Sequence, residues 1–101
     1  MTIRDFAAIM TALPFPVAHY EFSEPTPAPC MVYTDSSTEI QADGKTVFSD
    51  YLPRLELYAA PGEHESEAAL EELLTRNYIS FTKDQVWISE RHEIEYIYTL
   101  E

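Results

Sequence analysis

The spacing of apolar residues near the start of the chain predicts a helix. Between residues 2 and 13 they recur every three or four positions, as on one face of a helix: Ile3, Phe6, Ile9, Met10 and Leu13. Thr2 and Asp5 have the spacing of an N-terminal capping box. Because a proline disfavours helical geometry in the residue before it, Pro14 predicts that the helix ends at Leu13.

A second helix is predicted over residues 61–77. The segment opens with Pro61-Gly62 and sets apolar residues among glutamates at helical spacing: Ala69, Leu70, Leu73 and Leu74. Arg76 falls in the last turn, and Asn77 is a typical residue with which a helix ends.

Alternation of side chains predicts a strand pair at the end of the sequence. Residues 93–100 divide between the two faces of a strand, one set being Ile94, Tyr96, Tyr98 and Leu100 and the other Glu93, Glu95, Ile97 and Thr99. This strand is predicted to pair with residues 81–89, in which Lys83-Asp84-Gln85 is interpreted as a turn region or bulge.

Three more strands are predicted before the second helix. Residues 16–22 and 30–34 are rich in β-branched or aromatic side chains, and a stiff, proline-containing connection separates them. Residues 46–59 predict a long, half-exposed strand, in which Pro53 should lie at an edge or bulge because it cannot donate a ladder hydrogen bond. Helix, three strands, helix and strand pair is an order typical of α+β folds. We therefore predict a single α+β domain over residues 1–101, with a mainly antiparallel sheet of about five strands.

Charge and cysteine content narrow the function classes. Eighteen acidic residues against six Lys and Arg give a net charge of -12, and no basic residues cluster, so sequence-specific binding of DNA or RNA is not expected. The single cysteine, Cys30, can form no internal disulfide, which is typical of a reducing compartment. The sequence shows neither a signal-peptide pattern nor an apolar run of roughly eighteen residues, so we expect a cytoplasmic protein that enters no membrane.

No combination of residues predicts catalysis, a cofactor or a metal site. The histidines His19, His64 and His92 lack the spacing of a zinc site and are interpreted as solvated or strand-surface residues. The acidic run at 63–72 is interpreted as a solvated helix face, since a helix dipole favours glutamates in the first turn. With two glycines in the chain there is no phosphate-binding loop, and no serine sits in a glycine elbow. We therefore expect a protein that is not an enzyme.

Two sets of residues are candidates for contact with other proteins. The polar segment 35–47 is predicted to be a long exposed loop or a protruding hairpin. Its candidate contact residues are Asp35, Glu39, Asp43, Gly44 and Lys45. Tyrosines without interleaved basic residues favour strand packing and subunit contact over base stacking. The candidate interface aromatics are Tyr51, Tyr58, Tyr96 and Tyr98.

Several stretches, taken together and in order, add a resemblance to this picture. They are LPFPVAHYEF, PAPCMVY, ADGKTVF, LELYAAPGEHESEAALEELL and SERHEIEYIYTLE, and they span nearly the whole chain. In this order they resemble a family of small structural proteins from long-tailed phages and prophages of Gram-positive bacteria, of the tail-terminator or head–tail joining type, often described as minor tail proteins. The chain departs from the family at Pro16 and His19, and it has Gly44 where the family has asparagine. The last change is mild because both residues tolerate positive φ.

The resemblance implies a homo-oligomeric ring, commonly hexameric, at the place where the tail tube meets the head connector. It implies the tail-tube and head-connector proteins as partners, and neither catalysis nor a cofactor. The protein would reside in the cytoplasm of the bacterial host during assembly and in the tail or neck of the virion afterwards. An acidic channel would let DNA slide through without sticking, and the loop from Asp35 to Lys45 would reach a neighbouring ring.

Two other functions are weighed against this one. An acidic inhibitor or nucleic-acid mimic would bind a basic host protein through a contiguous acidic face. The acidic residues are instead spread from Glu21 to Glu101, with a local concentration at 63–72. A small enzyme or metal-dependent accessory subunit would need a convergent set of residues, which the sequence does not display.

Overall fold

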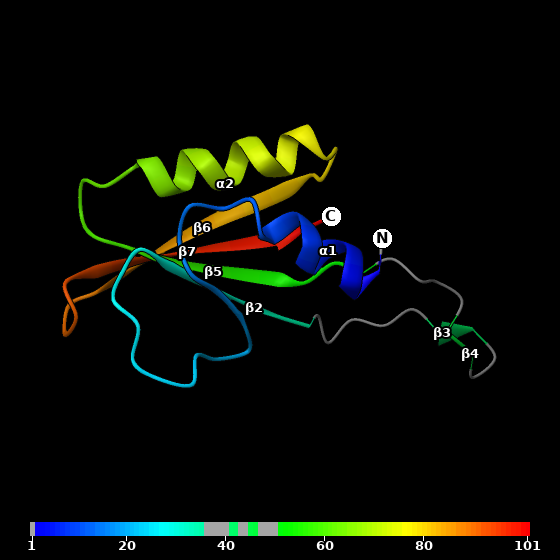
Figure 1. The fold of residues 1–101 in the computed structure, drawn as a ribbon, viewed down its shortest axis with the longest axis horizontal. Coiled ribbons are helices and arrows are strands. Elements are labelled where there is room, and N and C mark those ends of the chain that lie inside the picture. Colours follow the sequence, from blue (N-terminus) through cyan, green and yellow to red (C-terminus); the bar gives the residue numbers. More distant parts are fainter. Residues whose placement is uncertain (1, 36–40, 43–44, 47–50) are drawn as a thin grey trace.

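The computed structural model describes residues 2–35, 41–42, 45–46 and 51–101 (Figure 1). The elements in chain order are α1 (Ile3–Met10), β1 (Val17–His19), β2 (Cys30–Thr34), β3 (Gln41–Ala42), β4 (Lys45–Thr46), β5 (Arg54–Ala59), α2 (Glu65–Arg76), β6 (Phe81–Ile88) and β7 (Glu93–Leu100). The predicted α+β class is confirmed, with one helix at the N-terminus and the other before the C-terminal strand pair.

The main sheet has five strands in the order β1-β2-β5-β7-β6. All neighbouring strands are antiparallel except β1 and β2, which run parallel. Both helices lie on one face of this sheet, above it in Figure 1. A separate antiparallel pair joins β3 to β4, which matches the hairpin alternative for the polar segment.

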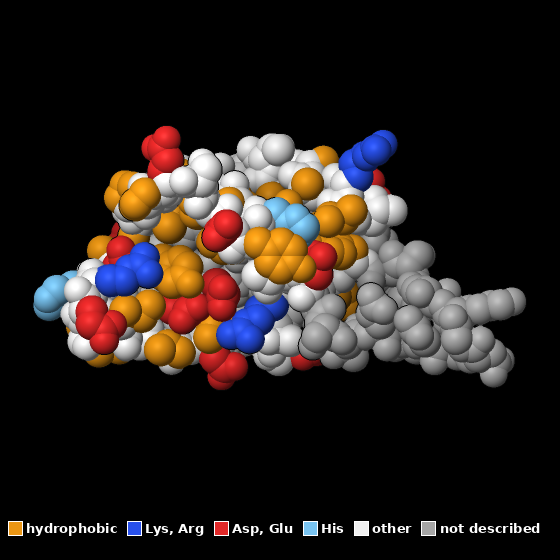
Figure 2. All heavy atoms as spheres, turned by 90° about the horizontal axis from the view of Figure 1, so that it is seen from below, with side chains coloured by type: hydrophobic (Ala, Val, Ile, Leu, Met, Phe, Trp, Pro, Cys, Tyr) orange, Lys and Arg blue, Asp and Glu red, His pale blue; other side chains and the backbone are white. Residues whose placement is uncertain are grey.

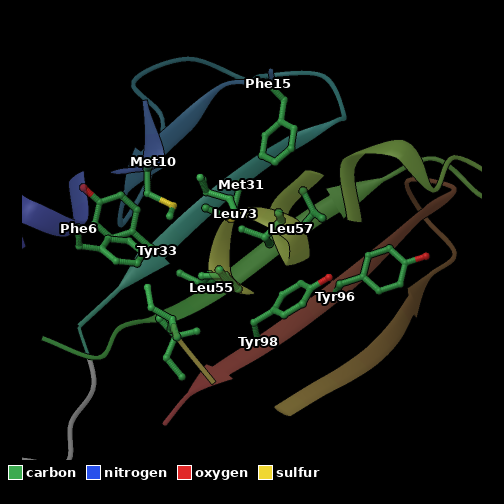
Figure 3. Close-up of a cluster of buried hydrophobic side chains, with 14 of the residues drawn as sticks. Phe6, Met10, Phe15, Met31, Tyr33, Leu55, Leu57, Leu73, Tyr96 and Tyr98 are labelled. Carbon is green, nitrogen blue, oxygen red and sulfur yellow. The ribbon is translucent and has the colours of Figure 1, made fainter. Parts of the chain in front are cut away.

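The core fills the space between the helices and the sheet (Figure 3). Leu55 and Leu57 of the central strand are fully buried there, and the intervening Glu56 faces the other way. From α1, the ring of Phe6 meets Tyr33 edge to face at 5.2 Å. From α2, Leu70, Leu73 and Leu74 supply the apolar face that the sequence predicted.

Both helices end where local hydrogen bonding favours it. The capping box is confirmed, since the Asp5 amide donates to Thr2 Oγ1 at 3.1 Å and the Thr2 amide to Asp5 Oδ2 at 3.2 Å. The expected end of α1 at Leu13 is wrong, because α1 ends at Met10. After that point the amides bond three residues back, and the Thr11 hydroxyl donates to the Ala8 carbonyl at 2.6 Å. Asn77 is the C-cap of α2, as predicted.

Two strand predictions need correction. Lys83-Asp84-Gln85 is neither a turn nor a bulge, because it forms the middle of β6 in unbroken register with β7. Its polar composition reflects exposure on an edge strand, and the turn of the hairpin lies at residues 89–92. The long strand at 46–59 is reduced to β5, which starts at Arg54. Pro53 lies at neither an edge nor a bulge; it is buried immediately before the central strand, where no ladder hydrogen bond is required of it.

Candidate functional site

Within the residues that the structure describes, no helix covers the face of the sheet opposite α1 and α2. The cross-strand register brings together on this open face Val32, Thr34, Arg54, Glu56, Tyr58, Thr82, Asp84, Val86, Ile88, Glu93, Glu95, Ile97 and Thr99. Figure 2 looks at this side and shows acidic and basic side chains set among apolar ones. Most of these residues are half-buried or exposed in the single chain. The open face is therefore the broadest surface on which a partner could lie against the sheet.

One end of the open face is closed by the connection between β1 and β2. Cys30 follows the same alternation but is only 3% exposed. Its Sγ lies 3.7 Å from the carbonyl oxygen of Thr26 in that connection. Burial raises the pKa of the Cys30 thiol, and the Glu93 carboxylate raises it further. This cysteine is consequently a shielded packing residue and not an accessible nucleophile.

The ionisable groups at the centre of the open face pair with one another. The Tyr58 hydroxyl donates to Glu95 Oε2 at 3.2 Å, and the Arg91 guanidinium lies 5.3 Å from the centre of the Tyr58 ring. Arg91 Nη2 is also 3.2 Å from Glu93 Oε1. Burial, reinforced by the carboxylates of Glu95 and Glu56, raises the pKa of Tyr58 to about 12. Tyr58 is thus held as a neutral hydrogen-bond donor between the Glu95 carboxylate and the Arg91 guanidinium.

Burial also raises the pKa of Glu56, and the negative charge of Glu95 on the neighbouring strand raises it further. Arg54, whose Nη2 is 3.5 Å from Glu56 Oε1, opposes this shift. In the described part of the chain, no group of three or more His, Cys, Asp or Glu side chains is placed to hold a metal ion. The open face therefore offers hydrogen bonds, charge and apolar area to a partner.

Asp35, at the start of the expected interaction loop, forms hydrogen bonds with residues that lie before and after the loop. His19 Nε2 lies 2.8 Å from Asp35 Oδ1, and the Tyr51 hydroxyl donates to the same carboxylate oxygen. Hydrogen bonds from Tyr51 and then His19 lower the pKa of Asp35. The His19 ring stacks on Tyr33 with ring centres 4.7 Å apart. Because Asp35 directly follows β2 and Tyr51 precedes β5, this cluster closes the base of the polar segment.

Of the five candidate loop residues, Asp35 lies in this cluster and Lys45 lies in β4. The candidates Glu39, Asp43 and Gly44 lie outside the described residues. The expectation that they contact a partner therefore stays a prediction.

The four candidate aromatics lie in different surroundings. Tyr96 and Tyr98 are 2% and 0% exposed beneath α2, so packing, and not subunit contact, is the explanation that applies to them. The Tyr98 hydroxyl donates to Glu71 Oε2 at 2.8 Å, beside Lys83, whose Nζ is 2.7 Å from the same oxygen. Tyr51 is half-buried in the cluster at the base of the loop. Only Tyr58 of this set lies on the open face.

Other exposed side chains were not singled out by the sequence. Trp87 and Val86 of β6 are 52% and 43% exposed, while Tyr20 and Tyr78 are 55% and 96% exposed. The interpretation of Lys83-Asp84-Gln85 as a turn split residues 81–88 into two parts. The exposed strand β6 was therefore not predicted as one element. The missed signal was the length of the 93–100 alternation, since a hairpin partner of equal length needs residues 81–88 as one unbroken strand.

No model of a known protein family matches this chain, and no curated protein and no solved structure matches it either. Among the described residues, neither helix is long and apolar enough to cross a membrane. What the protein does is accordingly inferred from its surfaces and from the resemblance of its sequence.

Proposed function

We propose that the chain is a non-catalytic structural subunit of a phage or prophage virion, of the tail-terminator or head–tail joining type. The observation that carries this proposal is the open face, a sheet surface with both helices on its other side. Val32, Tyr58 and Ile97 are only half-buried there, although they lie on three adjacent strands. In the cross-strand register Glu56 lies directly between Val32 and Ile97, so a partner that covers this area would bury apolar and ionisable side chains together, as protein interfaces do.

The chemistry of the open face suits a protein partner. Three of its carboxylates have a neighbour within the chain: Glu95 accepts from Tyr58, Glu93 lies beside Arg91, and Glu56 lies beside Arg54. A partner that covers the face would therefore meet carboxylates that are partly paired, and the burial of Val32 and Ile97 would contribute to the affinity. These features support binding to another protein as the function of this surface.

A ring requires that a patch on one subunit meet a different patch on the next. We propose the open face as one of these patches, and the resemblance supplies the expected hexamer and its tail-tube and head-connector neighbours. The net charge of -12 supports a channel through which DNA slides without adhering.

The distribution of charge favours this function over an acidic nucleic-acid mimic. A mimic needs uncompensated carboxylates along one face, and α2 carries the densest acidic run of the sequence. There Glu67 and Glu71 share Lys83, at 2.8 and 2.7 Å. Glu72 pairs with Arg76 at 2.8 Å. Pairing of this kind lowers the acidity that the helix presents to a basic partner.

The test is a charge placed at the centre of the open face. Ile97→Lys should abolish the formation of rings, both by the chain alone and with the tail-tube protein encoded in the same gene module. Thr75→Lys makes the same change of charge on the exposed side of α2 and should assemble like the wild type. Native mass spectrometry reports the assemblies, and circular dichroism checks that each variant is folded.

Two results would contradict the proposal. One is a wild-type chain that stays monomeric at every concentration and in the presence of the tail-tube protein. The other is an Ile97→Lys variant that assembles as well as the wild type. Genes for portal and tail-tube proteins on either side of this one would independently support the virion assignment.

A further inference from the structure

β6 presents an unpaired edge. It is the outermost strand of the main sheet, and among the described residues it pairs only with β7; its residues from Thr82 to Trp87 are all exposed. A strand edge exposes a row of main-chain donors and acceptors, and native proteins usually cover it or shorten it. β6 spans Phe81–Ile88, which is long for an uncovered edge.

The direction of the main-chain groups follows from the ladder. The Glu101 amide donates to the Ser80 carbonyl at 2.9 Å, so Ser80 and Glu101 form a hydrogen-bonded pair. Such pairs alternate along antiparallel strands, so every second residue after Ser80 also bonds to β7. The residues whose main-chain groups point outward are Phe81, Lys83, Gln85 and Trp87.

The other edge of the sheet is a poor match for β6. β1 consists of Val17–His19, and the ladder bonds on either side of it, Met31 N to Pro16 O and Tyr20 N to Tyr33 O, direct alternate residues toward β2. Only Val17 and His19 therefore point their main-chain groups outward. An edge of this length would leave most of the outward groups of β6 unpaired.

We propose that β6 pairs with β6 of a second copy of the chain, antiparallel, about a two-fold axis at Gln85. In a continuous sheet, opposite residues point to the same face, so the axis must pass through a residue and not between two. An axis at Asp84 would set two carboxylates directly opposite each other, which is unfavourable. An axis at Val86 would pair only residues 84–88 within the strand.

An axis at Gln85 pairs residues 82–88 of both copies and opposes no like charges. It places Lys83 opposite Trp87 of the second copy, where the lysine stem can pack on the indole while its ammonium stays with Glu67 and Glu71. It places Asp84 opposite Val86. The charges of Lys83 and Asp84 cancel within β6, so the two strands meet without local repulsion.

This contact goes beyond the proposed ring and does not rest on it. A two-fold contact closes after two copies, whereas a ring needs two different patches. It concerns the free chain, in which it would cover Trp87 and Val86, both large apolar side chains exposed on β6. It uses the strand edge and leaves Ile97 on the open face untouched.

The register is tested by a matched pair of variants, Val86→Lys and Thr82→Lys. In the proposed register residue 86 faces Asp84 of the second copy, whereas residue 82 faces Ile88. Val86→Lys should therefore dimerise about tenfold more tightly than Thr82→Lys in sedimentation equilibrium, because only it sets a lysine opposite a carboxylate. Net charge alone predicts no difference, because both variants change it from -12 to -11.

The edge itself is tested by Gln85→Pro. This change removes an outward N–H without removing a bond to β7, so the variant should be folded and monomeric. If circular dichroism shows that it is unfolded, Gln85→Asp replaces it, with Gln85→Asn as its neutral control. The Asp variant sets two carboxylates at the axis and should be monomeric, while the Asn variant should dimerise.

The proposal is overturned by a wild type that is monomeric throughout, by Thr82→Lys dimerising as tightly as Val86→Lys, or by a folded Gln85→Pro or Gln85→Asp variant that dimerises like the wild type. The Ile97→Lys variant separates the two proposals, because it should lose assembly with the tail-tube protein yet keep the β6 dimer.

Discussion

Glu56 and Glu95 are diagonal neighbours on adjacent strands of the open face, since Glu56 is opposite Ile97 and Glu95 is opposite Tyr58. Placing two carboxylates this close raises the pKa of Glu56, in addition to the larger effect of burial. The half-buried Glu56 carboxyl destabilises the folded chain when it is ionised. It is the residue at which we expect the pH of the solution to act most directly on the open face.

Replacement of Glu56 by glutamine should change how stability depends on pH. Because its pKa in the folded chain is raised above the ordinary 4.5, the folded state binds this proton more tightly than the unfolded state does. Wild-type stability from this group therefore falls as pH rises from 4.5 through the raised pKa. We expect Glu56→Gln to gain stability relative to the wild type between about pH 4 and about pH 7, measured by urea unfolding.

The control for this prediction is Glu90→Gln, which removes one negative charge from the exposed hairpin turn. Carboxyl groups with lowered pKa values, such as Asp35 and Glu63, contribute less to the stability of the folded chain as the pH falls. This loss is the same in the wild type and in the variant. A difference between Glu56→Gln and wild type that does not change with pH would contradict the prediction.

Single residues show where inference from sequence stops. The alternation of 93–100 correctly placed Tyr96 and Tyr98 on one face of a strand. It did not show that α2 covers that face, because the packing of a distant helix leaves no trace in a local period. The same alternation placed Ile97 and Glu95 together, yet only the register with β5 brings Tyr58 beside them.

At the level of elements, the end of α2 contains a residue that its conformation does not favour. The Ile79 amide donates to the Leu74 carbonyl at 2.9 Å and the Tyr78 amide to the Thr75 carbonyl at 3.0 Å, which is a Schellman motif. Tyr78 occupies the position usually taken by glycine, with φ at 58°. Its side chain is 96% exposed, so no packing within the chain offsets this strain.

Tyr78→Gly should stabilise the chain by about 0.5 kcal/mol, because the relief of left-handed strain exceeds the greater freedom of glycine in the unfolded state. Tyr78→Ala removes the same ring but keeps Cβ, and it should give no such gain. Urea unfolding of the three proteins measures the difference. Equal stability of the glycine and alanine variants would show that the backbone conformation is not the cause.

Elements with a strong local pattern could be predicted, and the others could not. The capping box of α1 and the leucines of α2 each combine spacing with a terminal signal, and both helices were found. β6 was divided because an edge strand need not alternate when both of its faces are exposed. The parallel pairing of β1 with β2 depends on how the connection between them crosses the sheet, which short-range patterns do not encode.

At the level of the whole molecule, charge opposes every contact between copies. Each chain carries a net charge of -12, so two chains in contact have a net charge of -24, twice -12. The β6 edge is locally neutral. The open face carries Arg54, and Arg91 lies at its border. Self-association at these surfaces must therefore overcome repulsion that arises elsewhere on the chain.

Added salt should accordingly strengthen self-association of the wild-type chain. Raising the ionic strength from 0.01 to 0.1 M shortens the Debye length from about 30 to about 10 Å, which screens repulsion between distant charges but leaves main-chain hydrogen bonds and apolar burial at β6 in place. Sedimentation equilibrium at the two salt concentrations should show dimers that are about tenfold tighter at the higher one. Sodium chloride is the salt to use, because sulfate also strengthens apolar burial, and an equal osmolality of sucrose is the uncharged control. Association that weakens with sodium chloride would instead show that attraction between opposite charges holds the copies together, which the neutral, hydrogen-bonded contact at Gln85 does not allow.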